Sequence, residues 1–371
     1  MNSVLDDDHE ELRQMVRRFF AEKSSEDEVR RLMESPSGYD PAVWKQMARE
    51  LGLQGIGIAE EYGGSGGDQV ALSVVFEEMG RVLLCAPYFA TVALAANLLT
   101  YSGDSSAMTD YLPGIAEGET IATVALAERA GGWNESSVEL PATWNGNTWT
   151  LTGAKTLVLD AAVADLILVI ARTAAGVSIF AVDRDAHGLS VEVLTTLDQT
   201  RRQGRLRFDS TPARLIGEDG EGWGPVARML DLAAVSLAAE GAGGAARVLE
   251  LATDYANDRV QFGHTIGSFQ VIKHRVAELF IAVEGVKAVA YQGAWAVSTG
   301  DDRLRRLAHV AKAHCSDVFF EVAVENIQIH GAIGFTWEHP AHMFFKSAKS
   351  SQLLFGDSSF HRTKLASHLG V

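Results

Sequence analysis

A break between two long helical patterns is the feature that most constrains the fold of this chain. The first pattern continues through Asn257, and Gly263 and Gly267 then interrupt it because glycine favours conformations that end a helix. A second helix is predicted to open near Ser268. The break therefore predicts two neighbouring helices joined by a short connection, as in an up-down bundle.

The connection carries a cation, an aromatic ring and an amide. Arg259 and Phe262 are three residues apart, which predicts that they share one helical face, and Gln270 stands at the start of the next helix. This set suits a dinucleotide, because a guanidinium pairs with pyrophosphate, a ring packs on a base or sugar, and an amide binds a polar edge. A helix hairpin with a surface arginine and a core phenylalanine explains the same residues equally well.

Bulk composition narrows the classes of protein. The chain has 371 residues, 47% of them hydrophobic, which is enough for two or three packed units. A net charge of −16 argues against nucleic acid or an anionic membrane as the main partner. Cys85 and Cys315 do not make a disulfide framework or a metal site, and we expect both to be buried in a reducing compartment. The N-terminus lacks a signal-peptide pattern, so a cytoplasmic protein is expected.

Hydrophobic periodicity divides the chain into three regions. Residues 1–120 have helical spacing, and the glycine run of 63–67 within them is interpreted as a structural turn because it lacks the lysine of a P-loop. Residues 121–222 hold short strand-like runs without long helices between them, which predicts an antiparallel, barrel-like β-domain. Residues 223–371 return to helical spacing and predict an up-down helical bundle. The small residues of 238–246 predict close approach to a neighbouring element or to a flat ring.

Three motifs carry a resemblance to a known family. They are RVQFG with SFQ over 259–270, QIHGAIGF over 328–335, and LGLQGIGIAEEYGGSGG over 51–67. On these motifs the chain resembles the acyl-CoA dehydrogenase family of FAD enzymes over nearly its whole length. The resemblance implies an N-terminal helical domain, a middle β-domain and a C-terminal four-helix bundle. It also implies FAD as cofactor, an acyl-CoA as substrate, and removal of an α-proton and a β-hydride from the thioester.

The resemblance also locates the catalytic base, which this chain lacks. The family places a glutamate at one of two positions, and these correspond here to Phe355 and to Ala233. Since a positioned base contributes about two to four orders of magnitude in rate, its absence matters. Asp357 and Glu240 are nearby substitutes. We expect Asp357 to be a helix N-cap and Glu240 to be a packed helix residue.

The flavin-ring side of the family pattern is altered as well. The family's threonine- and glycine-rich loop corresponds to the run over 126–134, and its Trp-Ile-Thr run reads Leu157-Val158-Leu159 here. The ring-stacking tryptophan and the hydrogen-bonding threonine are thus both leucine. Each lost hydrogen bond to a buried polar edge is worth about 1–3 kcal/mol.

The nucleotide side of the pattern is complete. The resemblance implies cofactor binding by a set of five residues, which we call the nucleotide-side set: Arg259, Phe262, Gln270, Gln328 and Gly331. In the family's dimers such a set reaches the cofactor of the neighbouring subunit. The chain is therefore expected to complete the FAD site of a paralogous partner, similar to the heteromeric α2β2 enzymes of bacterial steroid side-chain degradation. An active homo-oligomer that uses Glu240 or Asp357, and a non-enzymatic scaffold, are the alternatives.

Overall fold

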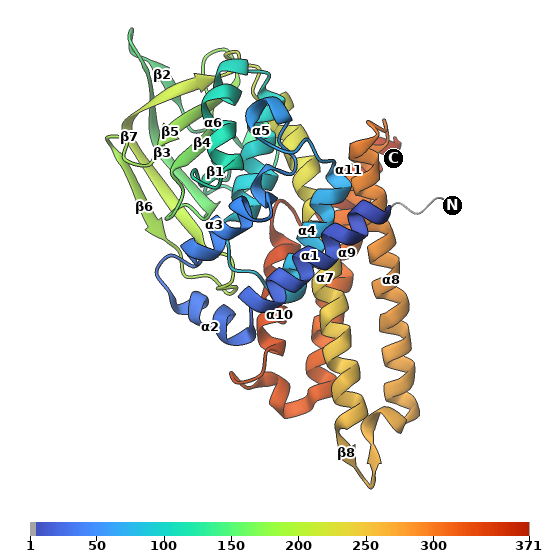
Figure 1. Cartoon of the computed structure of the whole chain (residues 1–371). Coiled ribbons are helices and arrows are strands. Elements are labelled where there is room, and N and C mark those ends of the chain that lie inside the picture. Colours follow the sequence, from blue (N-terminus) through green and yellow to red (C-terminus); the bar gives the residue numbers. More distant parts are fainter. Residues whose placement is uncertain (1–4, 371) are drawn as a thin grey trace. The chain divides into compact units, whose positions relative to one another are not determined.

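A computed structural model of the protein describes residues 5–370. Helices come first, strands follow, and helices return, which confirms the predicted mainly α fold with a central β-domain (Figure 1). The contacts divide the chain into two compact units, each discontinuous in sequence. Unit 1 holds residues 1–31, 69–84 and 234–371, and unit 2 holds 32–68 and 85–233. The domain boundaries near 120 and 222 stay predictions.

Unit 1 is helical. Its elements are α1 (Asp7–Lys23), the first residues of α2 (Glu26–Glu34), α4 (Gln69–Val82), most of α7 (Trp223–Asp258), α8 (Gln270–Ser298), α9 (Leu304–His330), α10 (Ala341–Leu353) and α11 (Ser358–Leu369). The long helices α7, α8 and α9 run side by side (Figure 1). The hairpin of β8 (Val260–Gln261) and β9 (His264–Thr265) lies beyond the ends of α7 and α8. A short 3-10 helix, η6 (Gly331–Phe335), follows α9.

Small residues let α7 approach its neighbours, as the sequence predicts. A Cβ added to Gly80 of α4 would lie 2.0 Å from the Glu240 carbonyl oxygen, and one added to Gly243 of α7 would lie 1.8 Å from the Glu77 carbonyl oxygen. Because backbone meets backbone at both points, no larger side chain fits there. The glycines therefore set the crossing of α4 and α7.

Buried charges tie α1 to this crossing. Glu78 of α4 is 1% exposed, and its two carboxylate oxygens accept hydrogen bonds from Arg17 of α1 at 2.8 and 2.7 Å. Arg13 of α1 donates to Glu77 at 3.2 Å and to the Tyr291 hydroxyl of α8 at 2.6 Å. Buried carboxylates need such partners, so α1 is held in place by this network.

Unit 2 combines short helices with a sheet. The helices are α3 (Pro41–Arg49), η1 (Leu53–Gly55), η2 (Glu60–Tyr62), the π-helix η3 (Phe89–Ala96), α5 (Asn97–Ser102), α6 (Ser105–Ala116) and η4 (Glu135–Ser137). The strands are β1 (Ala122–Ala125), β2 (Ala142–Trp144), β3 (Trp149–Leu159), β4 (Leu166–Arg172), β5 (Val177–Asp183), β6 (Leu189–Val193) and β7 (Gln203–Ile216).

The sheet follows the order β1-β4-β5-β7-β3-β2, and β6 also pairs with β7. These pairs are antiparallel, as predicted, except that β1 runs parallel to β4. β3 unites two runs that the sequence suggested as separate strands, because a bulge near Leu157 bends the strand without ending it. Leu157 takes a left-handed conformation there, with φ 55°.

The expected burial of both cysteines is confirmed. Cys85 and Cys315 are buried thiols that form no disulfide, and burial raises the pKa of each to about 12, which makes both unreactive. α7 is the one helix of the described residues that is long and apolar enough to cross a membrane. Its apolar window is 89% buried inside the protein, as in the core helix of a folded domain.

Candidate functional site

The nucleotide-side set begins in a hairpin that follows α7. The helix ends at Asp258, and β8 (Val260–Gln261) pairs with β9 (His264–Thr265). The Ile266 N–H donates to the Arg259 carbonyl at 2.8 Å and closes the base of the hairpin. The prediction that Arg259 and Phe262 share a helical face is therefore wrong. Phe262 and Gly263 have φ values of 56° and 82°, which belong to a tight hairpin turn and not to a helix.

Phe262 occupies a strained position at the tip of this hairpin. A left-handed conformation is destabilising by about 1–2 kcal/mol for a residue with a side chain, and asparagine or glycine would tolerate the turn better. The ring is 89% exposed, and it meets the Phe269 ring edge-on with 6.3 Å between centroids. Little burial within the described residues compensates for this strain.

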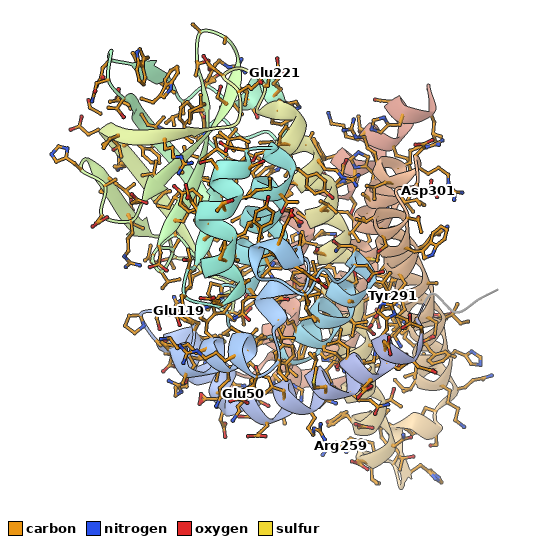
Figure 2. All side chains as sticks on the ribbon, turned by 45° about the horizontal axis from the view of Figure 1, so that its top comes forward. Glu50, Glu119, Glu221, Arg259, Tyr291 and Asp301 are labelled. Atoms are coloured by element: carbon orange, nitrogen blue, oxygen red, sulfur yellow. The ribbon has the colours of Figure 1, made fainter. Side chains whose placement is uncertain are left out.

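Arg259 is an exposed cation at the base of the same hairpin (Figure 2). Within residues 5–370, no hydrogen bond or ion pair engages its guanidinium. Arg275, one helix further on, is the opposite case: its guanidinium lies 2.9 to 3.1 Å from Glu278, Glu321 and Glu325. The charge of Arg259 is thus available to an anion, whereas that of Arg275 is already neutralised.

The other three members of the set lie at helix ends. Gln270 is the first residue of α8, and Gln328 is in the last turn of α9; both side chains are exposed. Gly331 caps α9 with φ 66° and ψ −139°, and its N–H donates to the Gln328 carbonyl. No atom lies within 4 Å of a Cβ added to Gly331, so this glycine is required by its backbone conformation and leaves open space beside it.

An apolar cluster holds these helix ends together. Ala252 and Ala256 of α7 pack with Ile329 of α9, and Ile266 and Ile272 lie against them. The Tyr255 ring also stacks on the His330 ring, with 4.2 Å between centroids. The structure therefore brings all five predicted residues to one end of unit 1, on its surface.

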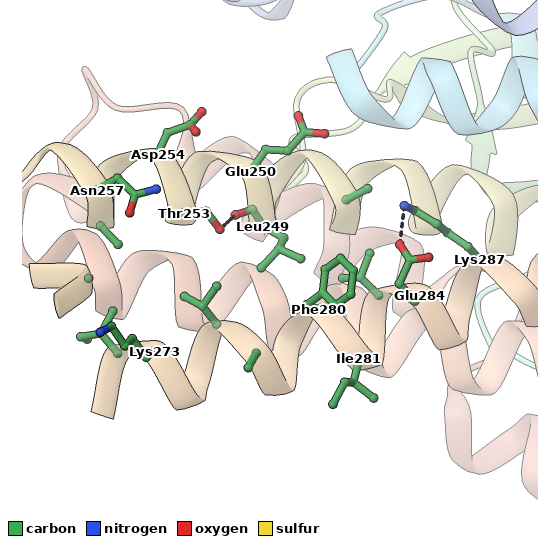
Figure 3. Close-up of a pocket in the computed structure, with 17 residues that line it drawn as sticks. Leu249, Glu250, Thr253, Asp254, Asn257, Lys273, Phe280, Ile281, Glu284 and Lys287 are labelled. Carbon is green, nitrogen blue, oxygen red and sulfur yellow. Dashed lines mark hydrogen bonds and ion pairs between the residues drawn. The ribbon is translucent and has the colours of Figure 1, made fainter. Parts of the chain in front are cut away.

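A groove of about 850 Å³ continues from this end between α7 and α8 (Figure 3). Its walls are mainly apolar, and Phe280 points into it toward α7. Ile281, which also lines the groove, is 72% exposed. Glu250 and Asp254 line it from α7, and Lys273 and Lys287 line it from α8. Large exposed hydrophobic side chains on one helix are typical of a surface that another chain covers.

The first position that the family uses for its base is apolar and enclosed here. Phe355 is 8% exposed and left-handed, with φ 58°. Asp357 caps α11 as predicted, since its carboxylate accepts the Phe360 N–H at 2.8 Å. A carboxylate engaged as an N-cap is poorly placed to take a proton from a substrate.

The second base position is also apolar. Ala233 is 0% exposed and its neighbour Ala234 is 2% exposed, so α7 presents only methyl groups at this point. Glu240, the substitute two turns further along α7, is half-buried, and its backbone lies at the crossing with α4.

The altered loop of the β-domain is held by an internal ion pair. Glu128 lies 2.6 Å from the Lys155 ammonium and accepts the N–H groups of Glu139 and Leu140 at 3.0 and 2.9 Å. Burial lowers the pKa of Lys155 to about 8 despite this partner. Burial acts to raise the pKa of Glu128, but the Lys155 hydrogen bond and charge bring it below its ordinary value. Glu128 therefore organises the loop and has little capacity left for a ligand.

The leucines that replace the ring-side residues differ in burial. Leu159 is 2% exposed, and its carbonyl accepts the Thr123 hydroxyl at 2.6 Å. Leu157 is 45% exposed at the bulge of β3. Neither side chain has a hydrogen-bonding group, so this part of the strand offers a ligand only apolar contact.

Sequence reasoning missed three buried polar side chains of unit 1. Lys312 of α9 is 1% exposed, and the His309 and His361 imidazoles meet with 2.9 Å between their Nδ1 atoms. The only signal in the sequence is that Lys312 lies between two alanines on an apolar helix. The carbonyl groups around Lys312 include that of Gln352, which lies 40 residues later in the chain.

Comparison with known proteins agrees with this geometry. The chain matches the acyl-CoA dehydrogenase N-terminal, middle and C-terminal domains over residues 6–119, 123–211 and 220–370. It is 31% identical over 352 residues to the acyl-CoA dehydrogenase IpdE2 of Mycolicibacterium smegmatis, which covers 95% of this chain and 96% of that protein. The chain belongs to the acyl-CoA dehydrogenase family. It is thus a member of a family of flavoprotein oxidoreductases.

Solved structures of the family have the same fold. The structure superposes with a TM-score of 0.88 and 30% identity on a variant of the steroid acyl-CoA dehydrogenase Tcur3481–Tcur3483, covering 98% of each chain. It superposes with a TM-score of 0.90 and 26% identity on the ChsE4–ChsE5 complex from Mycobacterium tuberculosis, covering 100% of this chain and 99% of that one. Butyryl-CoA dehydrogenase from Megasphaera elsdenii gives 0.93 at 25% identity, covering all of both chains.

Proposed function

We propose that this chain is a subunit of a heteromeric, FAD-dependent acyl-CoA dehydrogenase, and that it completes the FAD site of a catalytically intact partner. The observation that carries the proposal is the contrast between two parts of the family site. The nucleotide-side set is exposed and turned outward, whereas both base positions hold apolar side chains.

The residues of the nucleotide-side set fit the dinucleotide part of FAD. Arg259 supplies a cation without an intramolecular partner, which suits a pyrophosphate. Phe262 supplies an exposed ring, and Gln270 and Gln328 supply amides that donate and accept hydrogen bonds. Gly331 leaves room for close approach of the ligand. Bound FAD would accept the β-hydride of the acyl-CoA, while the residues of this chain bind and orient the cofactor.

The proposed partner is a paralogous acyl-CoA dehydrogenase chain that supplies the missing glutamate. Two features of unit 1 support it: the apolar groove between α7 and α8, and the strained exposed Phe262. The heteromeric ChsE4–ChsE5 complex has the same fold. We propose an α2β2 assembly with fewer flavins than chains.

The substrate would be an acyl-CoA thioester, and a steroid acyl group is the first to test. The basis is the likeness to a steroid acyl-CoA dehydrogenase. We place the assembly in the cytoplasm, in line with the two reduced, buried cysteines.

Expression with and without a paralogous chain from the same gene neighbourhood tests the proposal. The lone chain is expected to carry no FAD and to leave acyl-CoA unchanged, and the co-expressed complex is expected to be yellow and active. Full activity of the lone chain that is abolished by Glu240→Gln would establish the homo-oligomeric alternative. A colourless complex with every paralogue would establish the scaffold alternative.

A further inference from the structure

The turn that carries Phe355 is enclosed by α9. It joins α10 to α11 over 354–357, and two consecutive residues, Phe355 and Gly356, have left-handed φ values of 58° and 108°. A Cβ added to Gly356 would lie 2.3 Å from the Phe360 ring, so only glycine fits there. A bulky residue in this conformation is destabilising by about 1–2 kcal/mol. The turn therefore persists only because its surroundings hold it.

Lys312 is the main group that holds it. Its ammonium donates to the carbonyl oxygens of Ser351 at 2.8 Å, Gln352 at 3.2 Å and Gly356 at 3.3 Å, and to the Ser316 hydroxyl at 3.1 Å. Within residues 5–370 no carboxylate pairs with it. The positive charge is compensated by carbonyl groups at the C-terminal end of α10, where the helix dipole is negative.

Asp317, on the next turn of α9, holds the other side. Its carboxylate accepts hydrogen bonds from the Gln352 amide at 3.0 Å and from the Ser358 hydroxyl and the Arg362 guanidinium, both at 2.5 Å. Gln352 precedes the turn, and Ser358 and Arg362 follow it. A cation and an anion of one helix thus fix both ends of the turn.

The hydrogen bonds of Lys312 and Asp317 hold the turn more firmly than a buried phenylalanine requires. Burying a lysine without a carboxylate is unfavourable, and burial lowers the pKa of Lys312 to about 8. Phe355 has no proton chemistry, and an ordinary loop would bury a phenylalanine without strain or a buried cation.

We propose that Lys312 is a positioning residue, which holds the carbonyls of Ser351, Gln352 and Gly356 so that the side chain at position 355 leaves the turn in one fixed direction. The backbone that would present a base is then intact, and only its side chain has changed. Phe355→Glu alone would place a carboxylate at this position. The interpretation of position 355 as a base position rests on the proposed function, whereas the role of Lys312 in holding the turn does not.

Amide hydrogen exchange of the purified chain tests the role of Lys312 without cofactor or partner. In Lys312→Met, exchange over 352–358 is expected to accelerate at least tenfold, while α8 stays as protected as in the wild type. Lys155→Met is the matched control, because it removes a buried lysine of unit 2 that has a similarly lowered pKa. It is expected to leave exchange over 352–358 unchanged. Unchanged exchange in Lys312→Met, or acceleration spread evenly through unit 1, would overturn the proposal.

The second arm uses Phe355→Glu in the lone chain, with no cofactor or partner. While Lys312 holds the turn, the new carboxylate is expected to occupy one environment and to give a single carboxyl resonance in NMR spectra. Addition of Lys312→Met is expected to split or broaden that resonance, because the side chain then leaves the turn in more than one direction. Identical resonances with and without Lys312→Met would overturn the positioning role.

Discussion

The nucleotide-side end of unit 1 and the Glu128–Lys155 loop of unit 2 treat polar groups in opposite ways. At the first, Arg259 is exposed without an intramolecular partner and Phe262 is strained and exposed. At the second, the carboxylate accepts three hydrogen bonds and the ammonium is fully buried. The difference shows which polar side chains can still bind a ligand and which are already hydrogen-bonded within the chain. We propose that another molecule binds the exposed groups of the first region, whereas the polar groups of the second are satisfied within the chain.

The largest effect on stability is expected in the Glu128–Lys155 loop. Glu128→Ala leaves the Lys155 ammonium buried without its carboxylate, and breaking such a pair from one side is destabilising by about 3–5 kcal/mol. Urea unfolding of the lone chain measures it. Glu139→Ala is the control, because this exposed neighbour has no such partner in the described part of the chain. A loss below about 1 kcal/mol for Glu128→Ala would show that the loop is not held by this pair.

The largest effect on FAD binding is expected at the nucleotide-side end of unit 1. Arg259→Ala in the flavin-bearing complex should lower FAD affinity, because a hydrogen bond to a charged group is worth about 1.5–3 kcal/mol, or roughly 10- to 150-fold. Flavin absorbance during dilution or dialysis measures it. Arg275→Ala removes a nearby arginine that Glu278, Glu321 and Glu325 already neutralise, and it should leave FAD content unchanged. Equal flavin retention by the two variants would contradict the site assignment.

Phe262→Asn should act with opposite sign on the lone chain and on the complex. Asparagine tolerates the left-handed turn, so the lone chain should gain about 1 kcal/mol of stability. The complex should lose affinity for FAD because the exposed ring is gone. Thermal unfolding and flavin retention measure the two effects. Phe335→Asn, at an exposed position without a left-handed backbone, should bring no gain in stability. A less stable Phe262→Asn chain would refute the strain argument.

The last prediction concerns acid stability. Burial is the main cause that lowers the pKa of His309 to about 4 and that of His361 to about 3, from an ordinary 6.5. The unfolded chain therefore takes up these protons first, so stability is lost as pH falls from about 6.5 toward 4. A His309→Leu, His361→Leu double variant should lose less stability than the wild type between pH 7 and 5 in urea unfolding. His314→Leu, at an exposed position of α9, should behave as the wild type.

Local signals predicted much of this fold. The helix that ends beside Asn257, the N-cap at Asp357 and the burial of both cysteines each depend on neighbouring residues or on composition. The close approach of α7 to a neighbour followed from the small residues of 238–246, although the sequence did not identify that neighbour as α4. Each of these features is encoded within a few turns of chain, which is why the sequence was sufficient.

Other features depend on contacts between distant segments. The hairpin at Phe262 is local, but it was missed because Phe-Gly is an unusual pair for such a turn. The short strand β1 takes its identity from pairing with β4, about 40 residues further along the chain. The carbonyls around Lys312 likewise come from α10 and the turn after it, so the residues next to Lys312 in the sequence do not predict them.

The flavin content of the lone chain, beside that of its complex with a paralogous chain, tests the central claim most directly. The account predicts a colourless lone chain, and a yellow, active complex that loses its flavin when Arg259 is replaced by alanine. A lone chain that holds one FAD per polypeptide and oxidises acyl-CoA at full rate would contradict it.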